Sequence, residues 1–94
     1  MSQLFSLADR RALVTGSSQG IGYALARGLA EAGAEIVLNG RDAGKLAKAA
    51  ESLRGTGAMV HELAFDATDH EGVRAAIDGF EAEHGAIDIL VNNA

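Results

Sequence analysis

Short runs of consecutive apolar residues alternate along this chain with stretches of helical periodicity. The runs predict four strands, at Ala12–Val14, Glu35–Asn39, Ala58–Phe65 and Ile87–Asn93. A strand that is apolar on both faces is buried on both sides, and strands that alternate with helices imply a parallel sheet with right-handed crossovers. We therefore predict an α/β fold. One doubly wound domain covers residues 1–94, in the order β-α-β-α-β-α-β, with helices on both faces of the sheet.

The intervening stretches predict three amphipathic helices, each followed by a glycine. The apolar stripe of the first helix comprises Ile21, Ala24, Leu25, Gly28, Leu29 and Ala32, and that of the second comprises Leu46, Ala49, Ala50 and Leu53. Thr68 and Glu71 have the spacing of a capping box, which predicts the start of the third helix. Its stripe comprises Val73, Ala76, Ile77 and Phe80. Asn39–Gly40 is also a hairpin signal, but the segment after it has helical period and composition, which favours a helix.

Composition narrows the class of function. The chain carries a net charge of −5 and no cluster of Lys and Arg, which argues against a nucleic-acid partner. No apolar run approaches the ~20 residues of a membrane span. The absence of cysteine excludes a disulfide, a thiolate nucleophile and a zinc–cysteine site, and it fits a reducing compartment. We expect a cytoplasmic protein with no nucleic-acid or membrane partner.

Three glycines, Gly16, Gly20 and Gly22, lie within seven residues between the first strand and the first helix. A tight turn at this point gathers unpaired backbone N–H groups and the positive end of the helix, which together bind anions. Gly16 permits the turn, Gly20 permits a pyrophosphate to approach the backbone, and Gly22 permits the helix to pack closely on the strand. The glycine turn is therefore predicted to bind a diphosphate.

The spacing of this turn selects among nucleotide-binding motifs. The phosphate loop of nucleoside-triphosphate hydrolases needs Lys followed by Ser or Thr at the helix start, where this chain has Ile21. The common Gly-x-Gly-x-x-Gly pattern also fails, because Leu25 stands where its last glycine would be. The observed pattern, Thr15-Gly16-x-x-x-Gly20-Ile21-Gly22, resembles the glycine motif of the short-chain dehydrogenase/reductase family.

Two further segments strengthen this resemblance, which spans Leu4 to Ala94. Asp66 follows the third strand, as an Asp or Asn does in the family, and Asp88–Ala94 is similar to the family's Asn-Asn-Ala-Gly segment. Thr15–Asp42 is similar in particular to gluconate 5-dehydrogenase-like members. The resemblance implies a Rossmann-type domain whose cofactor contacts are Gly16, Ser18, Gln19, Gly20, Ile21 and Gly22 at the pyrophosphate, Asp66 and Ala67 at the adenine, and Asn93, beside Ala94, at the ribose.

The residue that ends the second strand governs the choice of cofactor. An acidic side chain there binds the 2'-hydroxyl of NAD and repels the 2'-phosphate of NADP. We place the neutral Asn39 at this point, with Arg41 two residues later, and a guanidinium forms charge-assisted bonds to phosphate. NADP is therefore the expected cofactor. Gln19 stands where the family has a second basic residue, so the use of NAD stays open.

The resemblance implies an oxidoreductase that interconverts a secondary alcohol and a ketone on a polyol, a sugar acid or a similar small substrate. The family's catalytic Ser, Tyr and Lys follow the Asn-Asn-Ala-Gly segment, so we expect them beyond this chain, which then resembles the N-terminal, truncated part of a dinucleotide-binding domain. A homodimer or homotetramer is implied for the full-length protein. The alternative is a non-catalytic nucleotide-binding or interaction module that kept the fold.

Other candidate side chains receive structural interpretations. In the family that this chain resembles, the catalytic Tyr is followed four residues later by a Lys. Tyr23 lies in the helix after the glycine turn and is followed at that spacing by Arg27, so we assign it to packing on the helix surface. His61, His70 and His84 have no spacing that would bring two rings together as metal ligands. No metal site is expected.

Overall fold

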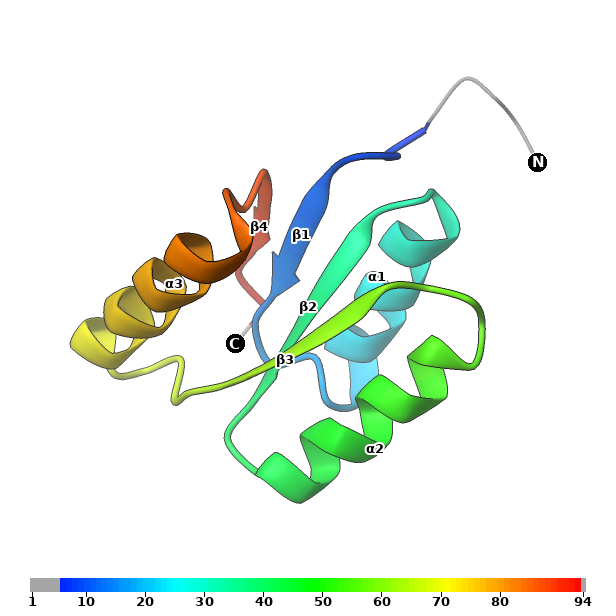
Figure 1. The fold of residues 1–94 in the computed structure, drawn as a ribbon. Helices are drawn as coiled ribbons and strands as arrows, with labels where there is room; N and C mark the ends of the chain where they lie inside the picture. The colour runs from blue at the N-terminus through cyan, green and yellow to red at the C-terminus, as the bar shows by residue number, and fades with distance from the viewer. Residues whose placement is uncertain (1–5, 94) are drawn as a thin grey trace.

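The computed structural model, which describes residues 6–93, contains one parallel sheet and three helices in the described part of the chain (Figure 1). The strands are β1 (Arg11–Val14), β2 (Glu35–Gly40), β3 (Val60–Ala64) and β4 (Ile89–Val91), in the spatial order β3-β2-β1-β4. The helices are α1 (Gly20–Glu31), α2 (Ala43–Arg54) and α3 (His70–His84). The predicted order of elements and the parallel sheet are confirmed.

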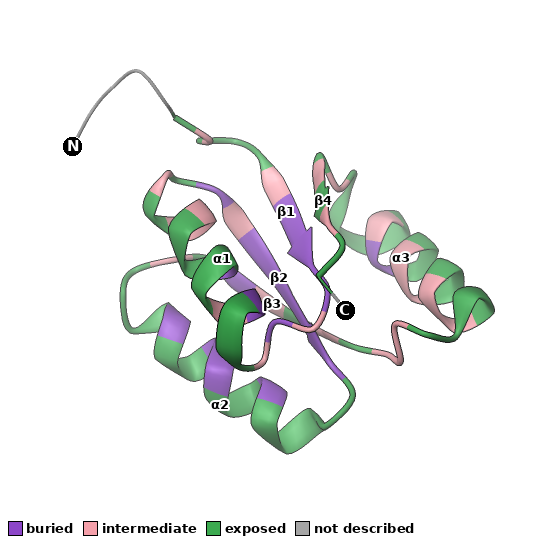
Figure 2. Ribbon diagram, turned by 180° about the vertical axis from the view of Figure 1, so that it is seen from behind, coloured by how far each residue is buried: buried purple, intermediate pink, exposed green. Residues whose placement is uncertain are grey.

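Helices cover both faces of the sheet, as predicted. Figure 1 shows α1 and α2 on one side of the strands and α3 on the other. Alternate residues of β1 and β2 point to opposite faces, so Leu13 and Val37 pack with Phe80 of α3. The larger cluster, on the α1 and α2 face, contains Ala12, Val14, Ala26, Ala34, Ile36, Leu38, Leu46, Ala49, Ala50, Leu53 and Val60. The most completely buried strands are therefore β1 and β2, at the centre of the sheet (Figure 2).

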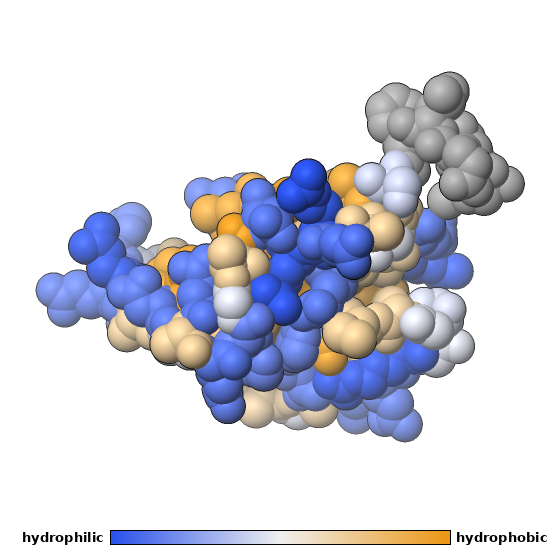
Figure 3. All heavy atoms as spheres, turned by 45° about the horizontal axis from the view of Figure 1, so that its top comes forward, coloured by the Kyte–Doolittle hydropathy of each residue, from blue (hydrophilic) through white to orange (hydrophobic). Residues whose placement is uncertain are grey.

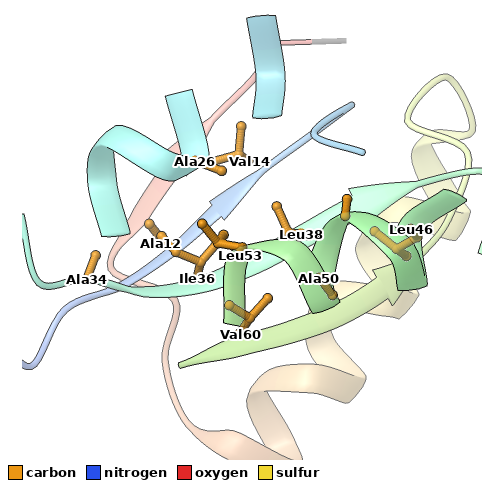
Figure 4. Close-up of a cluster of buried hydrophobic side chains, with 11 residues drawn as sticks. Ala12, Val14, Ala26, Ala34, Ile36, Leu38, Leu46, Ala50, Leu53 and Val60 are labelled. Carbon is orange, nitrogen blue, oxygen red and sulfur yellow. The ribbon is translucent and has the colours of Figure 1, made fainter. Parts of the chain in front are cut away.

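The apolar stripe predicted for α2 is confirmed in full. Its four residues, Leu46, Ala49, Ala50 and Leu53, are all buried. Figure 4 shows the labelled side chains of α2 directed toward those of β2. The stripe of α3 is confirmed with Phe80 buried and its other three members half-buried.

The apolar stripe predicted for α1 is wrong in its first two turns, although Leu29 does pack against the larger cluster. Ile21 is 75% exposed and Leu25 is 42% exposed, whereas the buried residues of this helix are Gly22 and Ala26. Gly22 lies against the backbone of the preceding turn, and this contact sets the rotation of the helix about its axis. At 100° per residue, the small side chains at i and i+4 then face the sheet, and Ile21 and Leu25 turn outward.

The predicted capping box of α3 is also wrong. The N-cap is Asp69, whose side chain accepts a hydrogen bond from the backbone N–H of Gly72 at 3.1 Å. The hydroxyl of Thr68 donates instead to the carboxylate of Asp66 at 2.7 Å. A competing local turn therefore takes Thr68 out of the capping position. The end of the helix is as predicted, because Gly85 follows it with a φ of 102°.

Burial of the fourth strand on both sides is wrong for the described residues. Ile89 and Val91 pack against the cluster under α1 and α2, but Leu90 is 59% exposed. Leu90 pairs in register with Leu13 and shares its face, where α3 packs over Leu13, Val37 and the side chains of β3. The helix therefore leaves β4, which lies at the sheet edge, uncovered on that face.

The surface in the view of Figure 3 is mostly hydrophilic, with small apolar areas between the polar side chains. Within residues 6–93, no helix has both the length and the apolar character that crossing a bilayer requires.

Candidate cofactor-binding site

The segments that follow β1, β2 and β3 meet at the carboxyl ends of these strands, where open parallel sheets bind their ligands. They enclose a pocket of about 240 Å³ lined by Gly16, Ser18, Gln19, Asn39, Gly40, Arg41, Phe65, Asp66, Ala67 and Thr68. Six of the ten residues predicted to contact a cofactor line this pocket: Gly16, Ser18, Gln19, Arg41, Asp66 and Ala67. The fold thus brings together three motifs that are far apart in the sequence.

The three glycines of the turn have different structural roles. Gly16 and Gly20 have φ values of 59° and 64°, in the left-handed region that favours glycine. A Cβ at Gly22 would overlap the carbonyl oxygen of Gly16 and lie 2.8 Å from the side-chain nitrogen of Asn93. A Cβ at Gly20 would have no protein atom within 4 Å, so this part of the backbone faces open space. The turn is tightly packed against the protein at Gly22 and accessible to a ligand at Gly20.

The start of α1 has no side-chain cap. Gln19 occupies the N-cap position in an extended conformation, its side chain makes no capping hydrogen bond, and the first turn of α1 contains no acidic residue. By contrast, α2 and α3 are capped by Asp42 and Asp69. The first N–H groups of α1 therefore point to where an anion would bind, together with the positive end of the helix dipole. Ile21, exposed in the same first turn, lies beside them.

Asn39 does not lie where the sequence predicts. The strand β2 ends at Gly40, and Asn39 is buried, with 1% of its surface exposed. Its side-chain oxygen accepts a hydrogen bond from the N–H of Gly16 at 2.9 Å, and its nitrogen donates to the carbonyls of Leu63 and Phe65 at 3.0 and 3.1 Å. The side chain is engaged by backbone and does not reach a ribose. It joins the glycine turn to the end of β3, a role that sequence reasoning missed although a polar residue within an apolar strand is a signal for it.

A second set of hydrogen bonds joins the glycine turn to the end of β4. The hydroxyl of Thr15 donates toward Val91 and Asn92, and it accepts from the N–H of Asn93 at 2.9 Å. The side-chain nitrogen of Asn93 donates to the carbonyl of Gly16 at 3.3 Å. Asn93, predicted to lie at the ribose, is thus exposed beside the glycine turn. Ala94 lies outside the described residues.

Opposite charges face each other on the far wall of the pocket. Asp66 accepts hydrogen bonds from the hydroxyl and the N–H of Thr68, at 2.7 and 2.9 Å. These bonds, together with the nearby Arg41, hold the pKa of the Asp66 carboxyl below its ordinary value. The guanidinium of Arg41 is exposed at the pocket, and no carboxylate follows β2 before Asp42, which caps α2.

This set of groups fits a dinucleotide that carries an additional phosphate. Free N–H groups at the start of α1 suit a diphosphate, and Arg41 suits a phosphate monoester. A larger depression of about 500 Å³ at the amino ends of the strands does not fit, because its charged lining residues are Asp9, Glu31 and Glu35. Three carboxylates there would repel a phosphate.

Tyr23 has the structural role that the sequence predicts. Its hydroxyl donates to the hydroxyl of Ser52 at 3.0 Å, and its ring packs against the cluster under α1 and α2. The spacing of the histidines does not predict that His61 and His84 are neighbours, but their ring centroids lie 4.7 Å apart, in a tilted contact beside Phe80. No group of three or more potential metal ligands occurs within the described part of the chain.

Known proteins with this sequence pattern share the fold. A gluconate 5-dehydrogenase of Gluconobacter oxydans (strain 621H) is 50% identical over 97% of this chain and 36% of that protein. A similar crystal structure is that of a gluconate 5-dehydrogenase from Burkholderia cenocepacia J2315 in complex with NADP and tartrate. Its sequence is 59% identical to this chain, and the two structures match with a TM-score of 0.90 over 96% of this chain and 35% of that one. L-sorbose reductase from Gluconobacter frateurii, complexed with NADPH and L-sorbose, is 44% identical with a TM-score of 0.88, over 96% of this chain and 35% of that one.

The chain spans about a third of the length of these relatives. The family model that describes short chain dehydrogenases matches residues 10–94, which include every strand, every helix and the whole glycine turn of the described structure. By its sequence, and by the geometry of its turn, the chain belongs to the short chain dehydrogenase family.

Proposed function

We propose that this chain binds NADP and forms the cofactor-binding part of an oxidoreductase that interconverts a secondary alcohol and a ketone on a polyol, a sugar acid or a similar small molecule. The observation that carries the proposal is the pocket in which the glycine turn, Arg41 and Asp66–Ala67 come together. Relatives support it, since a similar gluconate 5-dehydrogenase was solved with NADP and a similar L-sorbose reductase with NADPH and L-sorbose.

The residues of the chain bind and orient the cofactor. The N–H groups at the start of α1 hold the diphosphate, and Gly20 leaves its approach open. Ser18 and Gln19, which line the pocket, and Ile21, exposed in the first turn of α1, surround the diphosphate. Asp66 and Ala67 lie at the adenine. Asn93, exposed beside the glycine turn, lies at a ribose. Asn39 and Thr15 act indirectly, because their hydrogen bonds hold the glycine turn in place: Asn39 accepts from the N–H of Gly16, and Thr15 accepts from the N–H of Asn93. The bound cofactor supplies hydride transfer at its nicotinamide ring.

Arg41 selects NADP over NAD. Its guanidinium lies just after the end of β2, and the residues that end this strand, Asn39 and Gly40, carry no carboxylate to bind a ribose 2'-hydroxyl. In the intact protein, Arg41→Ala should therefore weaken the binding of NADPH by about 10-fold or more, the loss of one charge-assisted contact, and leave the binding of NADH nearly unchanged. Isothermal titration with both cofactors measures this difference. Equal losses for the two cofactors would contradict the assignment.

The whole protein's remaining properties follow from the same proposal. Residues 1–94 form the N-terminal part of a larger dinucleotide-binding domain, and proton transfer belongs to residues outside them. The intact protein is cytoplasmic and forms a homodimer or a homotetramer. Incubation of the intact protein with NADP and gluconate-like alcohols should raise the absorbance of reduced nicotinamide. Tight NADPH binding without any such turnover would instead favour a nucleotide-binding module without catalysis.

A further inference from the structure

A second pocket adjoins the proposed cofactor site. It has a volume of about 370 Å³ and is lined by Ser18, Gln19, Gly20, Tyr23, Lys45, Lys48, Ala49 and Ser52. It shares Ser18 and Gln19 with the pocket that contains Arg41, so these two residues line both spaces. The hydrogen bond between the hydroxyls of Tyr23 and Ser52 joins α1 to α2 along this second pocket. The two pockets therefore lie side by side at the N-cap of α1, and we call their combined lining the N-cap surface.

The cations on this surface form no close ion pairs in the described structure, although Asp66 lies near Arg41 and Asp42 lies near the two lysines. Ion pairs in the described structure involve Arg11, Arg27 and Arg54 among the arginines, whereas Arg41, Lys45 and Lys48 form none within residues 6–93. In a chain with a net charge of −5, three unpaired cations therefore lie around a single surface. Because none of the three is held in an ion pair within this part of the chain, each remains able to contact an anionic ligand, although Asp66 and Asp42 reduce the positive potential there.

The carboxylate of Asp42, the residue after Arg41, caps a helix and forms no ion pair among the described residues. It accepts a hydrogen bond from the backbone N–H of Lys45 at 3.0 Å and caps α2. Backbone hydrogen bonds from Lys45 and Gly44 hold the pKa of this carboxyl below its ordinary value, and the positive charges of Lys45 and Lys48 lower it further. Asp42 thus stays anionic on the helix end and forms no ion pair with either ammonium group in the described structure.

The charge of the proposed ligand calls for a second cation. A phosphate monoester carries about −1.5 to −2 charges at pH 7, and Arg41 supplies one positive charge. Gln19, between the two pockets, offers only a neutral amide. Lys45 is in the first turn of α2, four residues after Arg41, and lines the pocket on the other side of Gln19.

We propose that Lys45 is a second specificity-determining residue, whose ammonium group contacts the 2'-phosphate of NADP together with Arg41 and supplies the charge that Gln19 lacks. This inference rests on the proposed function, because it concerns the same ligand. Lys48, one turn further along α2, adds to the potential without contact.

The test is Lys45→Gln in the intact protein, with the dissociation constants of NADPH and NADH measured by isothermal titration. We expect NADPH to bind about 3- to 10-fold more weakly, since the ammonium group is exposed and partly screened, and NADH to bind within about 2-fold of the wild type. Lys45→Arg should restore most of the NADPH affinity. Arg74→Gln is the matched control: it removes the same charge from α3, beside a different pocket, and should change neither constant.

Each result separates the inference from the function on which it rests. A loss of NADPH affinity in Lys45→Gln no larger than in Arg74→Gln, or an equal loss for NADH, would overturn the role of Lys45. If that occurs while Arg41→Ala still discriminates between the cofactors, the NADP assignment stands without Lys45. If Arg41→Ala fails to discriminate as well, the proposed function fails first. Thermal unfolding of each variant verifies that it is folded, as expected for substitutions of exposed side chains.

Discussion

Gly22 lies so close to the turn before α1 that a methyl group on it would overlap the carbonyl oxygen of Gly16. At Gly22 glycine is required by close contact with the protein's own backbone, whereas at Gly20 it is favoured by a positive φ. The amide of Asn93 donates to the same Gly16 carbonyl, so a displacement there would also disturb the end of β4. The position of the first N–H groups of α1 therefore depends on this contact.

Gly22→Ala should destabilise the intact protein by about 1–3 kcal/mol, the usual cost of overpacking a rigid site, and weaken NADPH binding. Gly28→Ala is the matched control within the same helix, because a Cβ there meets no atom within 4 Å. It should raise stability by about 0.4–1 kcal/mol. Denaturant unfolding measures both changes. Shifts of the same sign in the two variants would contradict the assigned contact.

Asn39→Asp tests the buried amide that holds the glycine turn. One carboxylate oxygen can still accept from Gly16, but the other would face the carbonyl oxygens of Leu63 and Phe65. Burial and these carbonyls favour the protonated acid and raise its pKa in the folded state. The variant should therefore lose stability as pH rises from 5 toward 8 by about 1–3 kcal/mol relative to wild type. A stability difference independent of pH in denaturant unfolding would contradict this account.

Sequence reasoning recognised the residues of the pocket but not the contacts that hold them. Gly16, Arg41 and Asp66 could be placed because each follows a strand, and parallel strands end at one edge of the sheet. The sequence predicts that β2 ends at Asn39, but the strand ends one residue later, at Gly40. A strand boundary cannot be predicted to one residue, and a shift of one residue turns the side chain to the opposite face of the sheet. The role that we propose for Lys45 was not predicted from the sequence, because it follows from a pocket beside that of Arg41, which periodicity does not encode.

Among the helices, α2 could be predicted in detail and α1 could not. The stripe of α2 packs on the sheet through ordinary side chains, so hydrophobic periodicity found its buried face. The rotation of α1 is set by a backbone contact at Gly22, and the face that it buries consists of small residues. Ile21 and Leu25 are apolar but exposed, so the periodicity predicted the wrong buried face. Hydrophobicity alone does not show which apolar side chains pack against the sheet.

The N-cap of α3 distinguishes two adjacent side chains. Asp69 accepts from the N–H of Gly72, whereas Thr68 bonds to Asp66 and does not cap the helix. Asp69→Ala should lower the free energy of unfolding by about 1 kcal/mol, and Thr68→Ala should lower it by less. Circular dichroism during denaturant unfolding of the two variants compares them. A larger loss of unfolding free energy in Thr68→Ala than in Asp69→Ala would contradict this assignment and support the capping box predicted from the sequence.

Glu35, at the start of β2, couples the three strands whose amino ends meet there. Burial raises the pKa of its carboxyl, but hydrogen bonds from Arg11 and His61, each at 2.7 Å, outweigh burial and lower the pKa from 4.5. A folded-state pKa below the unfolded one stabilises the protein above about pH 4.5, and this contribution is lost as pH falls through the folded value.

Glu35→Gln should therefore be less stable than the wild type at pH 7, and the two proteins should converge as the pH falls to about 3. Denaturant unfolding at several pH values measures the difference. Arg27→Gln, which removes a cation from the exposed Arg27–Glu31 pair, serves as the control for loss of a surface charge. A difference between wild type and Glu35→Gln that widens in acid would contradict the assigned contacts.

Over the whole molecule, the parallel strands of the sheet, in the order β3-β2-β1-β4, separate the proposed cofactor site from a half-buried cluster of ionisable residues. The two groups lie at opposite ends of the strands. The carboxyl ends carry the glycine turn and the cations around it, and the amino ends carry Glu35 with Arg11 and His61. Both outer strands lie at an edge, and Leu90 of β4 is exposed on the face that α3 does not reach. The overall architecture followed from the sequence because solid apolar strands that alternate with helices admit few other arrangements.

The most direct test is a crystal structure of the intact protein with NADPH. We predict the diphosphate within about 2.7–3.2 Å of the N–H groups at the start of α1, with the ribose phosphate beside Arg41. Binding of the cofactor away from the Gly16–Gly22 turn, with that backbone left free, would contradict the central claim that bare backbone at the start of α1 is the diphosphate receptor.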